Sequence, residues 1–330
     1  MKRILSILLV ITLLATLPLF ASCKKEEKAE LDSELAINVW TLNGTTGFGM
    51  APLIQNVKDG TAALNYQFTV ETNATIVRDA ILNGTADIGA VPTNLASTLY
   101  NATNGDVVLL AINTRGVLYL VANTAKVTAP STLVQLSGKT IYVPAQNPTF
   151  ITKALLEKAK IADVTINNTD YAEPAALQQA VAAGLVDYAI LPEPLLTVAN
   201  ASRAEGVTLT TALDITAEWD KAFETGSLVQ GCIVARRDFV ENHPNEVAKF
   251  LEEYRTSVNY VIENPEAASE MIVSAGIFAK APVAAKAIPK CNLTFMSGAE
   301  MKEAMQAFLT AMPLVSIGGA LPADDFYFGA

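Results

Sequence analysis

Short apolar runs alternate with amphipathic stretches along the first two thirds of the chain. Such runs predict buried strands, and stretches with apolar residues three or four positions apart predict helices. In the first part, strands are expected at 36–42, 65–71, 87–91 and 107–113, and helices at 50–58, 74–83 and 92–102. Because strand and helix alternate, the pattern predicts an α/β fold with mostly parallel sheets flanked by helices.

A polar break at 113–116 then joins two strands, 107–113 and 117–123, with no helix between them. We expect the chain to cross here into a second lobe. In that lobe strands are expected at 139–143, 163–169, 187–191 and 207–213, and helices at 131–136, 147–160, 173–183 and 192–204. The strand 227–236, with Gly231 in its middle, is expected to cross back. The helices predicted at 244–263, 265–274, 282–288 and 297–312 begin near Pro or Ser.

These crossings divide the chain into four regions. We expect a signal peptide at 1–23, a flexible tether at 24–34, a first lobe made of 35–115 and 232–330, and a second lobe at 116–231.

One stretch occurs twice, at 80–102 and at 180–201. With an offset of 100, the residues Ala80, Gly84, Asp87, Pro92 and Leu95 fall on Ala180, Gly184, Asp187, Pro192 and Leu195. Each copy reads as a helix ending at Gly, a buried strand and a Pro that opens the next helix. Since ligands of parallel sheets bind beyond the carboxyl ends of strands, 91–94 and 191–194 are expected to form paired rims of one cleft. The alternative is a chance match of common helix-stop and helix-start residues.

Composition narrows the class of protein. Hydrophobic residues make up 51% of the 330, charged residues 17%, and the formal net charge is −10. Without residues 1–23 the chain keeps 33 acidic residues against 21 basic ones. An acidic body without a basic stripe argues against nucleic-acid binding and favours a monomer.

The first residues are typical of an export signal, with Lys2 and Arg3 before an apolar run at 4–20. Ala21-Ser22-Cys23 resembles the lipobox of bacterial lipoproteins, which implies lipidation of Cys23 and membrane contact through the lipid anchor only. Plain signal cleavage and an uncleaved anchor are the alternatives. The body is therefore expected outside the cytoplasm, anchored to the cell membrane. There, Cys232 and Cys291 could form a disulfide or remain two buried free thiols.

Two further segments could present backbone N–H groups to a ligand. Residues 43–49 form a glycine-rich loop between a strand and a helix, although the spacing fits neither a dinucleotide fingerprint nor a P-loop. A plain tight turn is the alternative there. Asn147 is expected to cap the helix that follows it, with Pro148 at the first helical position.

Five segments taken together resemble the type II periplasmic binding proteins of ABC importers, in the branch that serves nitrate, sulfonates, taurine and thiamine precursors. They are VWTLNGTTGFGMAPLI (39–54), ILNGTADIGAVPTNLA (81–96), LVQLSGKTIYVPAQNPTFITKALLEKA (133–159), AAGLVDYAILPEPLLT (182–197) and GSLVQGCIVARRDFVENHPNEVAKFLEEY (226–254). The resemblance implies two α/β lobes joined by two hinge crossings, which close on a small solute and deliver it to an ABC permease with its ATPase. We expect no cofactor and no metal.

The resemblance also suggests the ligand-binding residues: Asn43, Gly44, Thr45, Thr46, Phe48, Pro92, Thr93, Asn94, Asn113, Arg115, Gln146, Asn147, Thr149, Phe150 and Glu193. Most are neutral amides, hydroxyls or aromatics, which suits a small polar or heteroaromatic solute. If Glu193 points inward the solute carries a cation or several N–H donors, and otherwise it is a solvated carboxylate at a helix start. Arg115 would favour an anion, or lie on the hinge surface. Gln146-Asn147-Pro148 stands where sulfonate binders tend to have serines.

Catalysis has little support in the sequence. His243 is the only histidine, and it precedes a helix in Glu241-Asn242-His243-Pro244. Neither a histidine cluster nor a Cys-x-x-Cys pair occurs in the sequence. We therefore expect a binding protein rather than an enzyme. The alternatives are a solute-sensing lipoprotein and an enzyme like the pyrimidine synthase of the same superfamily, whose cysteine cluster Cys232 and Cys291 do not reproduce.

Overall fold

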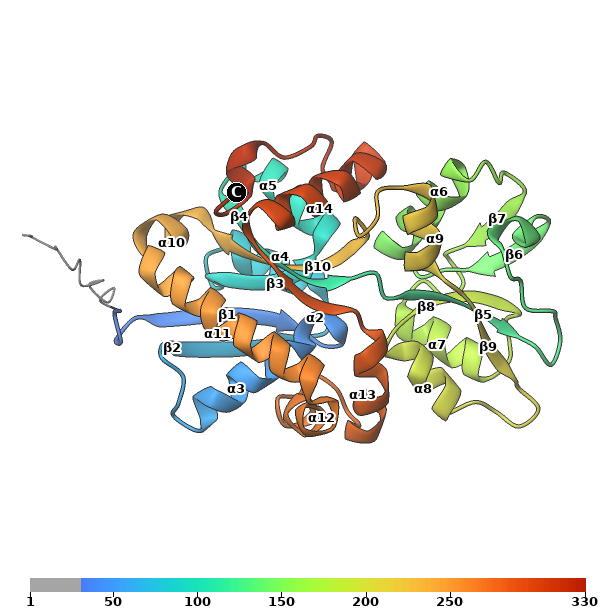
Figure 1. Ribbon diagram of the computed structural model, residues 1–330, viewed down its shortest axis with the longest axis horizontal. Helices are drawn as coiled ribbons and strands as arrows, with labels where there is room; N and C mark the ends of the chain where they lie inside the picture. The colour runs from blue at the N-terminus through green and yellow to red at the C-terminus, as the bar shows by residue number, and fades with distance from the viewer. Residues whose placement is uncertain (1–30) are drawn as a thin grey trace, which may run out of the picture. The chain divides into compact units, whose positions relative to one another are not determined.

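The fold is described from a computed structural model, which describes residues 31–330. The predicted signal peptide, Cys23 and most of the tether lie outside the described residues. Within Asp32–Ala330, which form one compact unit, the strands make two sheets (Figure 1).

The first sheet has the strand order β11-β4-β10-β3-β1-β2. Its strands are β1 (Ala36–Leu42), β2 (Asn65–Glu71), β3 (Ile88–Pro92), β4 (Val107–Arg115), β10 (Val229–Arg236) and β11 (Leu293–Met296). β1 pairs in parallel with β2 and β3, whereas β10 pairs antiparallel with both β3 and β4. β3 is buried on both faces, which explains its continuous apolar run.

The second sheet has the order β7-β6-β8-β5-β9. Its strands are β5 (Leu118–Asn123), β6 (Lys139–Tyr142), β7 (Val164–Asn167), β8 (Tyr188–Pro192) and β9 (Leu209–Asp214). β6 is parallel to β7 and β8, and β5 is antiparallel to β8 and β9. β8 therefore takes the place in this sheet that β3 takes in the first, as the repeat in the sequence predicts.

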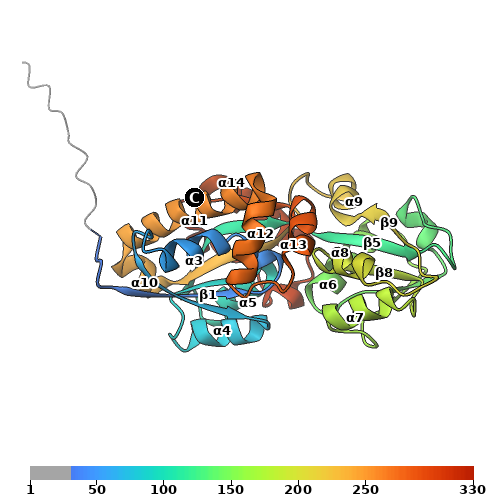
Figure 2. The same ribbon diagram turned by 90° about the horizontal axis from the view of Figure 1, so that it is seen from below.

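Helices cover both faces of the sheets. They are α2 (Thr45–Phe48), α3 (Ala51–Lys58), α4 (Ala74–Leu82), α5 (Thr93–Ala102), α6 (Asn147–Lys158), α7 (Pro174–Ala182), α8 (Leu195–Ala201), α9 (Ile215–Ala222), α10 (Arg237–Asn242), α11 (Pro244–Glu263), α12 (Pro265–Ser274), α13 (Ala281–Ala287) and α14 (Gly298–Ala311), with short 3₁₀ turns η1 (Leu133–Leu136), η2 (Ile288–Lys290), η3 (Leu314–Ile317) and η4 (Asp324–Phe326). Figure 2 shows α3 and α11 on one side of β1 and α4 on the other.

The chain passes between the sheets twice. β4 of the first sheet leads through Gly116 and Val117 into β5 of the second, and β9 leads through α9 back to β10. The predicted fold class is thus confirmed: the two α/β lobes have the architecture of a type II periplasmic binding protein. Each sheet is mixed, because the strands next to the crossings pair antiparallel with their neighbours.

Four helices and strands were not predicted, and one of them is the six-residue α10 directly after β10. α9 has eight residues, and its start is fixed by the Asp214 carboxylate, which accepts the Thr216 N–H at 2.8 Å. β11 has four residues and pairs only with β4, which is far away in the sequence. α2 is a single turn within the glycine-rich loop. No helix in the described part of the chain is long and apolar enough to cross a membrane.

Candidate functional site

Two predicted ligand residues from different lobes meet in one hydrogen bond. The Thr45 hydroxyl, at the start of α2, donates to the backbone carbonyl of Glu193 at 2.7 Å. Thr45 is 8% exposed and Glu193 only 2%. The glycine-rich loop after β1 and the predicted rim 191–194 after β8 are therefore in direct contact at the boundary between the lobes, whereas the rim 91–94 takes no part in this bond.

The Glu193 carboxylate is turned toward its own helix. Its two oxygens accept hydrogen bonds from the Thr197 N–H and hydroxyl, each at 3.0 Å, so the side chain caps the start of α8. Burial raises the pKa of Glu193, while the two Thr197 bonds and the nearby positive charge of Lys290 oppose part of that effect. Glu193 is thus a buried carboxyl at the lobe boundary and not a solvated one.

The loop 43–48 is held by tertiary contacts. Asn113 donates to the Thr46 carbonyl and to the Tyr254 hydroxyl, each at 3.0 Å, so its amide positions the loop. Phe48 is fully buried and packs edge-on against Phe278 at 6.0 Å between ring centroids. In this structure the Asn113 amide and the Phe48 ring are therefore engaged inside the first lobe.

Two positions in this loop require glycine, each for a different reason. Gly44 has a φ of 76°, the left-handed region that glycine adopts without strain. A Cβ on Gly47 would lie 1.8 Å from the Leu42 carbonyl oxygen, so only glycine fits. Asn43 is exposed beside them.

The turn 92–94 makes contacts with two other elements of the first lobe. The Thr93 hydroxyl donates to the Val229 carbonyl of β10 at 2.7 Å. Asn94 Nδ2 donates to the Ser316 carbonyl at 3.3 Å, but its buried Oδ1 has no partner. Pro92 ends β3 and precedes α5, whereas in the second copy α8 begins only at Leu195, later than predicted.

In the second lobe, the turn before α6 differs from the prediction in the residue that caps the helix. Gln146, exposed and with a φ of 62°, is the N-cap of α6, and Asn147 is the first helical residue. The expectation that Asn147 caps this helix is wrong. Asn147 is 8% exposed, and its Oδ1 is buried with no partner. Thr149 donates to the Pro144 carbonyl at 2.7 Å, and Phe150 packs against the core.

Arg115 lies at the first crossing and is directed toward α14. Its guanidinium is 3.6 Å from the Glu300 carboxylate and 3.4 Å from the Met296 sulfur, and the side chain is 39% exposed. This position agrees with the hinge-surface alternative.

The structure also decides between the two states of the cysteines. Cys232 and Cys291 are free and buried, so the disulfide alternative is not what the structure shows.

Contacts that the sequence did not indicate complete the lobe boundary. Cys291 Sγ lies 3.7 Å from the Thr45 hydroxyl oxygen, and the Tyr119 hydroxyl donates to the Lys290 carbonyl at 3.0 Å. Tyr119 and Lys290 are 171 positions apart, and no sequence signal joins them.

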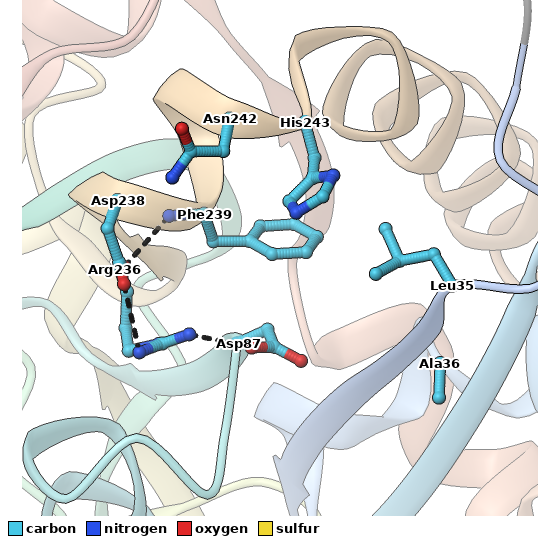
Figure 3. A pocket seen from close by; sticks show the side chains of 8 residues that line it. All are labelled: Leu35, Ala36, Asp87, Arg236, Asp238, Phe239, Asn242 and His243. Carbon is cyan, nitrogen blue, oxygen red and sulfur yellow. Dashed lines mark hydrogen bonds and ion pairs between the residues drawn. The ribbon is translucent and has the colours of Figure 1, made fainter.

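Two pockets lie elsewhere, and none of the predicted ligand residues lines either of them. The first, of about 230 Å³, is at the amino ends of β1 and β3 (Figure 3). It is lined by Leu35, Ala36, Asp87, Arg236, Asp238, Phe239, Asn242 and His243. The Arg236 guanidinium bridges Asp87 at 3.0 Å and Asp238 at 3.1 Å, and His243 packs on the Phe239 ring at 5.2 Å.

The second is a groove of about 970 Å³ along α14, lined on the other side by Lys158 and the residues 222–224. Among residues 31–330, no three His, Cys, Asp or Glu side chains gather in a way that could hold a metal ion.

Solved structures share this fold. An ABC transporter from Parabacteroides distasonis has a TM-score of 0.73 and 23% identity, over 90% of this chain and 99% of that one. The aliphatic sulphonate binding protein SsuA from Escherichia coli has a TM-score of 0.63 and 17% identity, over 84% and 85%. The nitrate-binding protein NrtA from Synechocystis has a TM-score of 0.62 and 13% identity, over 88% and 83%. At these identities the likeness concerns the fold alone. A search among curated proteins finds no match.

A family model described as Menaquinone biosynthesis matches residues 48–312. That finding overturns the expectation that the chain is not an enzyme, because the family includes enzymes of menaquinone biosynthesis. The match covers most of both lobes and both crossings. With the fold of the type II periplasmic binding proteins, the chain belongs to the menaquinone biosynthesis family.

Proposed function

We propose that the chain captures a small polar or heteroaromatic molecule between its two lobes, and that it does so as the lipid-anchored, extracytoplasmic binding component of an ABC importer. The lobes would be 35–115 with 232–330, and 116–231. The likeness of nearly the whole chain to a solved ABC transporter structure supports this proposal, as does the lipobox-like segment before Cys23. In this function the permease and its ATPase are the partners.

One observation carries the binding part of the proposal. Asn94 in the first lobe and Asn147 in the second each have a buried side-chain oxygen with no partner. Both stand at the start of a helix that follows a parallel strand, where ligands of such sheets bind. An unsatisfied buried acceptor costs about 1–3 kcal/mol. A solute that donates N–H or O–H groups would remove that cost in both lobes.

The contact between the lobes supports capture by closure. The bond from Thr45 to the Glu193 carbonyl exists only when the loop after β1 and the turn after β8 are together. A solute held by both lobes would favour that closed state by its difference in affinity between the closed and open forms.

Native mass spectrometry of the full chain purified from its host tests capture directly. We expect a bound small molecule, and its return to the stripped protein should raise the melting temperature. Asn94→Ala and Asn147→Ala should each weaken binding about tenfold or more, from the loss of an amide partner. Asn200→Ala is the control, because that amide bonds only the Leu196 carbonyl of its own helix. Unchanged affinity in both cleft variants would show that the site is elsewhere.

The family match favours a second function, a step of menaquinone biosynthesis in the same cleft. Buried Glu193, with its raised pKa, lies beside Tyr119, Lys290 and Cys291 at the lobe boundary and would be the acid or base of that step. Mass analysis of the copurified molecule after incubation with the chain would show a product. That product should be absent with Glu193→Gln. A molecule recovered unchanged from the unmodified chain would favour transport alone.

A further inference from the structure

Three consecutive residues after α13 each contact a different part of the molecule. The Lys290 carbonyl accepts from the Tyr119 hydroxyl of β5 at 3.0 Å. The Cys291 sulfur lies 3.7 Å from the Thr45 hydroxyl oxygen. Asn292 Nδ2 donates to the Gly116 carbonyl at 2.5 Å. The segment 290–292 therefore joins the second lobe, the loop after β1 and the first crossing.

The backbone of this segment is fixed at the crossing. Asn292 has a φ of 43°, a conformation that non-glycine residues adopt at a cost, although asparagine tolerates it better than most. Its carbonyl accepts the Arg115 N–H at 3.0 Å, so both its side chain and its backbone bond the chain next to Gly116. The crossing continues from there: the Val117 N–H donates to Gln230 Oε1 at 2.7 Å.

The helix α13, which precedes this segment in the chain, contacts the second lobe. α13 packs against α8, which the Glu193 carboxylate caps (Figure 1). The Thr45 hydroxyl has one hydrogen, and the Glu193 carbonyl at 2.7 Å accepts it. Opening of the lobes must therefore break the bonds made by Thr45 and Tyr119 and separate α13 from α8.

The two free cysteines differ in what covers them. Both are 0% exposed. Cys232 is a residue of β10 with its sulfur 3.4 Å from the Val91 carbonyl, inside the first sheet. Cys291 is beside Thr45 and near Glu193, at the boundary between the lobes. Separation of the lobes would expose the Cys291 thiol to solvent, whereas the Cys232 thiol would stay buried in its sheet.

We propose that two hydrogen bonds between the lobes, from Tyr119 to the Lys290 carbonyl and from Thr45 to the Glu193 carbonyl, form a latch that holds the lobes closed over Cys291, and that its release exposes the Cys291 thiol to reagents. The rate at which a reagent labels Cys291 therefore reports opening of the lobes. This inference rests on the lobe closure that the proposed function requires. It needs no solute, so its test does not depend on which function the cleft serves.

The test is the alkylation rate of each cysteine by N-ethylmaleimide in the full native chain, read by peptide mass spectrometry. Tyr119→Phe should raise the rate at Cys291 about fivefold, the change in open population expected from one hydrogen bond of about 1 kcal/mol. Cys232 should keep its slow rate. Tyr188→Phe is the matched control, because its hydroxyl bonds the Thr128 carbonyl within the second lobe at 3.1 Å.

A second pair of variants keeps the test independent of Tyr119. Thr45→Val should speed the labelling of Cys291, and Thr45→Ser, which keeps the hydroxyl, should not. An unchanged rate at Cys291 in both Tyr119→Phe and Thr45→Val would overturn the latch. A parallel rise at Cys232 would also overturn it, because exposure would then come from unfolding of the sheet. Failure to find a bound solute would count against the proposed function but would leave these labelling rates as they are.

Discussion

Replacement of Asn113 by alanine should destabilise the fold itself. The amide is 2% exposed and donates to the Thr46 carbonyl and the Tyr254 hydroxyl, each at 3.0 Å. Its Oδ1 accepts from the Thr114 hydroxyl, also at 3.0 Å. These bonds connect β4 with the loop that carries α2 and with α11. Asn113 thus acts on the candidate cleft through the position of the loop.

The expected loss of stability follows from the number of hydrogen bonds that each substitution removes. Each buried hydrogen bond contributes about 1 kcal/mol net, so Asn113→Ala should lower the free energy of unfolding by about 3 kcal/mol. Tyr254→Phe removes one of the same bonds and should cost about 1 kcal/mol. Because that bond is lost in both single variants, the double variant should lose about 3 kcal/mol, which is a coupling of about 1 kcal/mol.

Urea unfolding followed by tryptophan fluorescence and by circular dichroism gives these values. Tyr260→Phe, on the same helix as Tyr254, is the control, because the Tyr260 hydroxyl makes no hydrogen bond within the described residues. Its effect should stay within about 0.5 kcal/mol. Strictly additive losses in the double variant, or an Asn113→Ala variant as stable as the parent, would refute the reasoning.

Three more predictions concern stability. Burial raises the pKa of Glu193 above the ordinary value of 4.5. The contribution of this carboxyl to the free energy of unfolding is therefore full below pH 4.5 and is lost as the pH rises through the folded-state pKa. In denaturation at several pH values, the stability of the parent relative to Glu193→Gln should fall over that range. Asp87→Asn should cost about 2 kcal/mol in urea unfolding, because the Asp87 carboxylate pairs with Arg236 and also accepts hydrogen bonds from the backbone and side-chain N–H groups of Asn38. Asp238→Asn, which breaks a more exposed pair with the same arginine, should cost less than about 0.5 kcal/mol. Equal losses would contradict the role of burial and of the Asn38 bonds. Gly47→Ala should cost more than about 3 kcal/mol or prevent folding, because its Cβ would meet a backbone oxygen at 1.8 Å, and Gly44→Ala, with open space at its Cβ, should lose only about 1–2 kcal/mol by thermal melting.

Local patterns predicted most elements to within a few residues. The strands at 36–42 and 65–71 match the structure at both ends, since alternation of buried and exposed positions is a property of the strand itself. The repeat placed β3 and β8 correctly because each copy carries its own glycine stop and buried run. β11 escaped prediction, because a strand of four residues is recognised only by its partner β4.

In the predicted site, too, some features followed from local sequence and others depend on distant partners. Thr45 and Glu193, both of which the resemblance suggested as ligand residues, meet in one hydrogen bond. The direction of the Glu193 carboxylate, however, depends on two bonds to Thr197, and the use of Asn113 depends on Tyr254, 141 residues away. Neither partner is visible in a pattern of apolar and polar positions.

The sequence by itself determined most of the longer strands and helices and their alternation, because these follow from periodicity and from residues that act on their immediate neighbours. Only the tertiary structure decided which polar side chains are already satisfied and which remain unpartnered. Hydrogen bonds such as Tyr119 to Lys290 join residues that become neighbours only after both lobes have formed. The state of Cys291, free and covered at the lobe boundary, was decided in the same way.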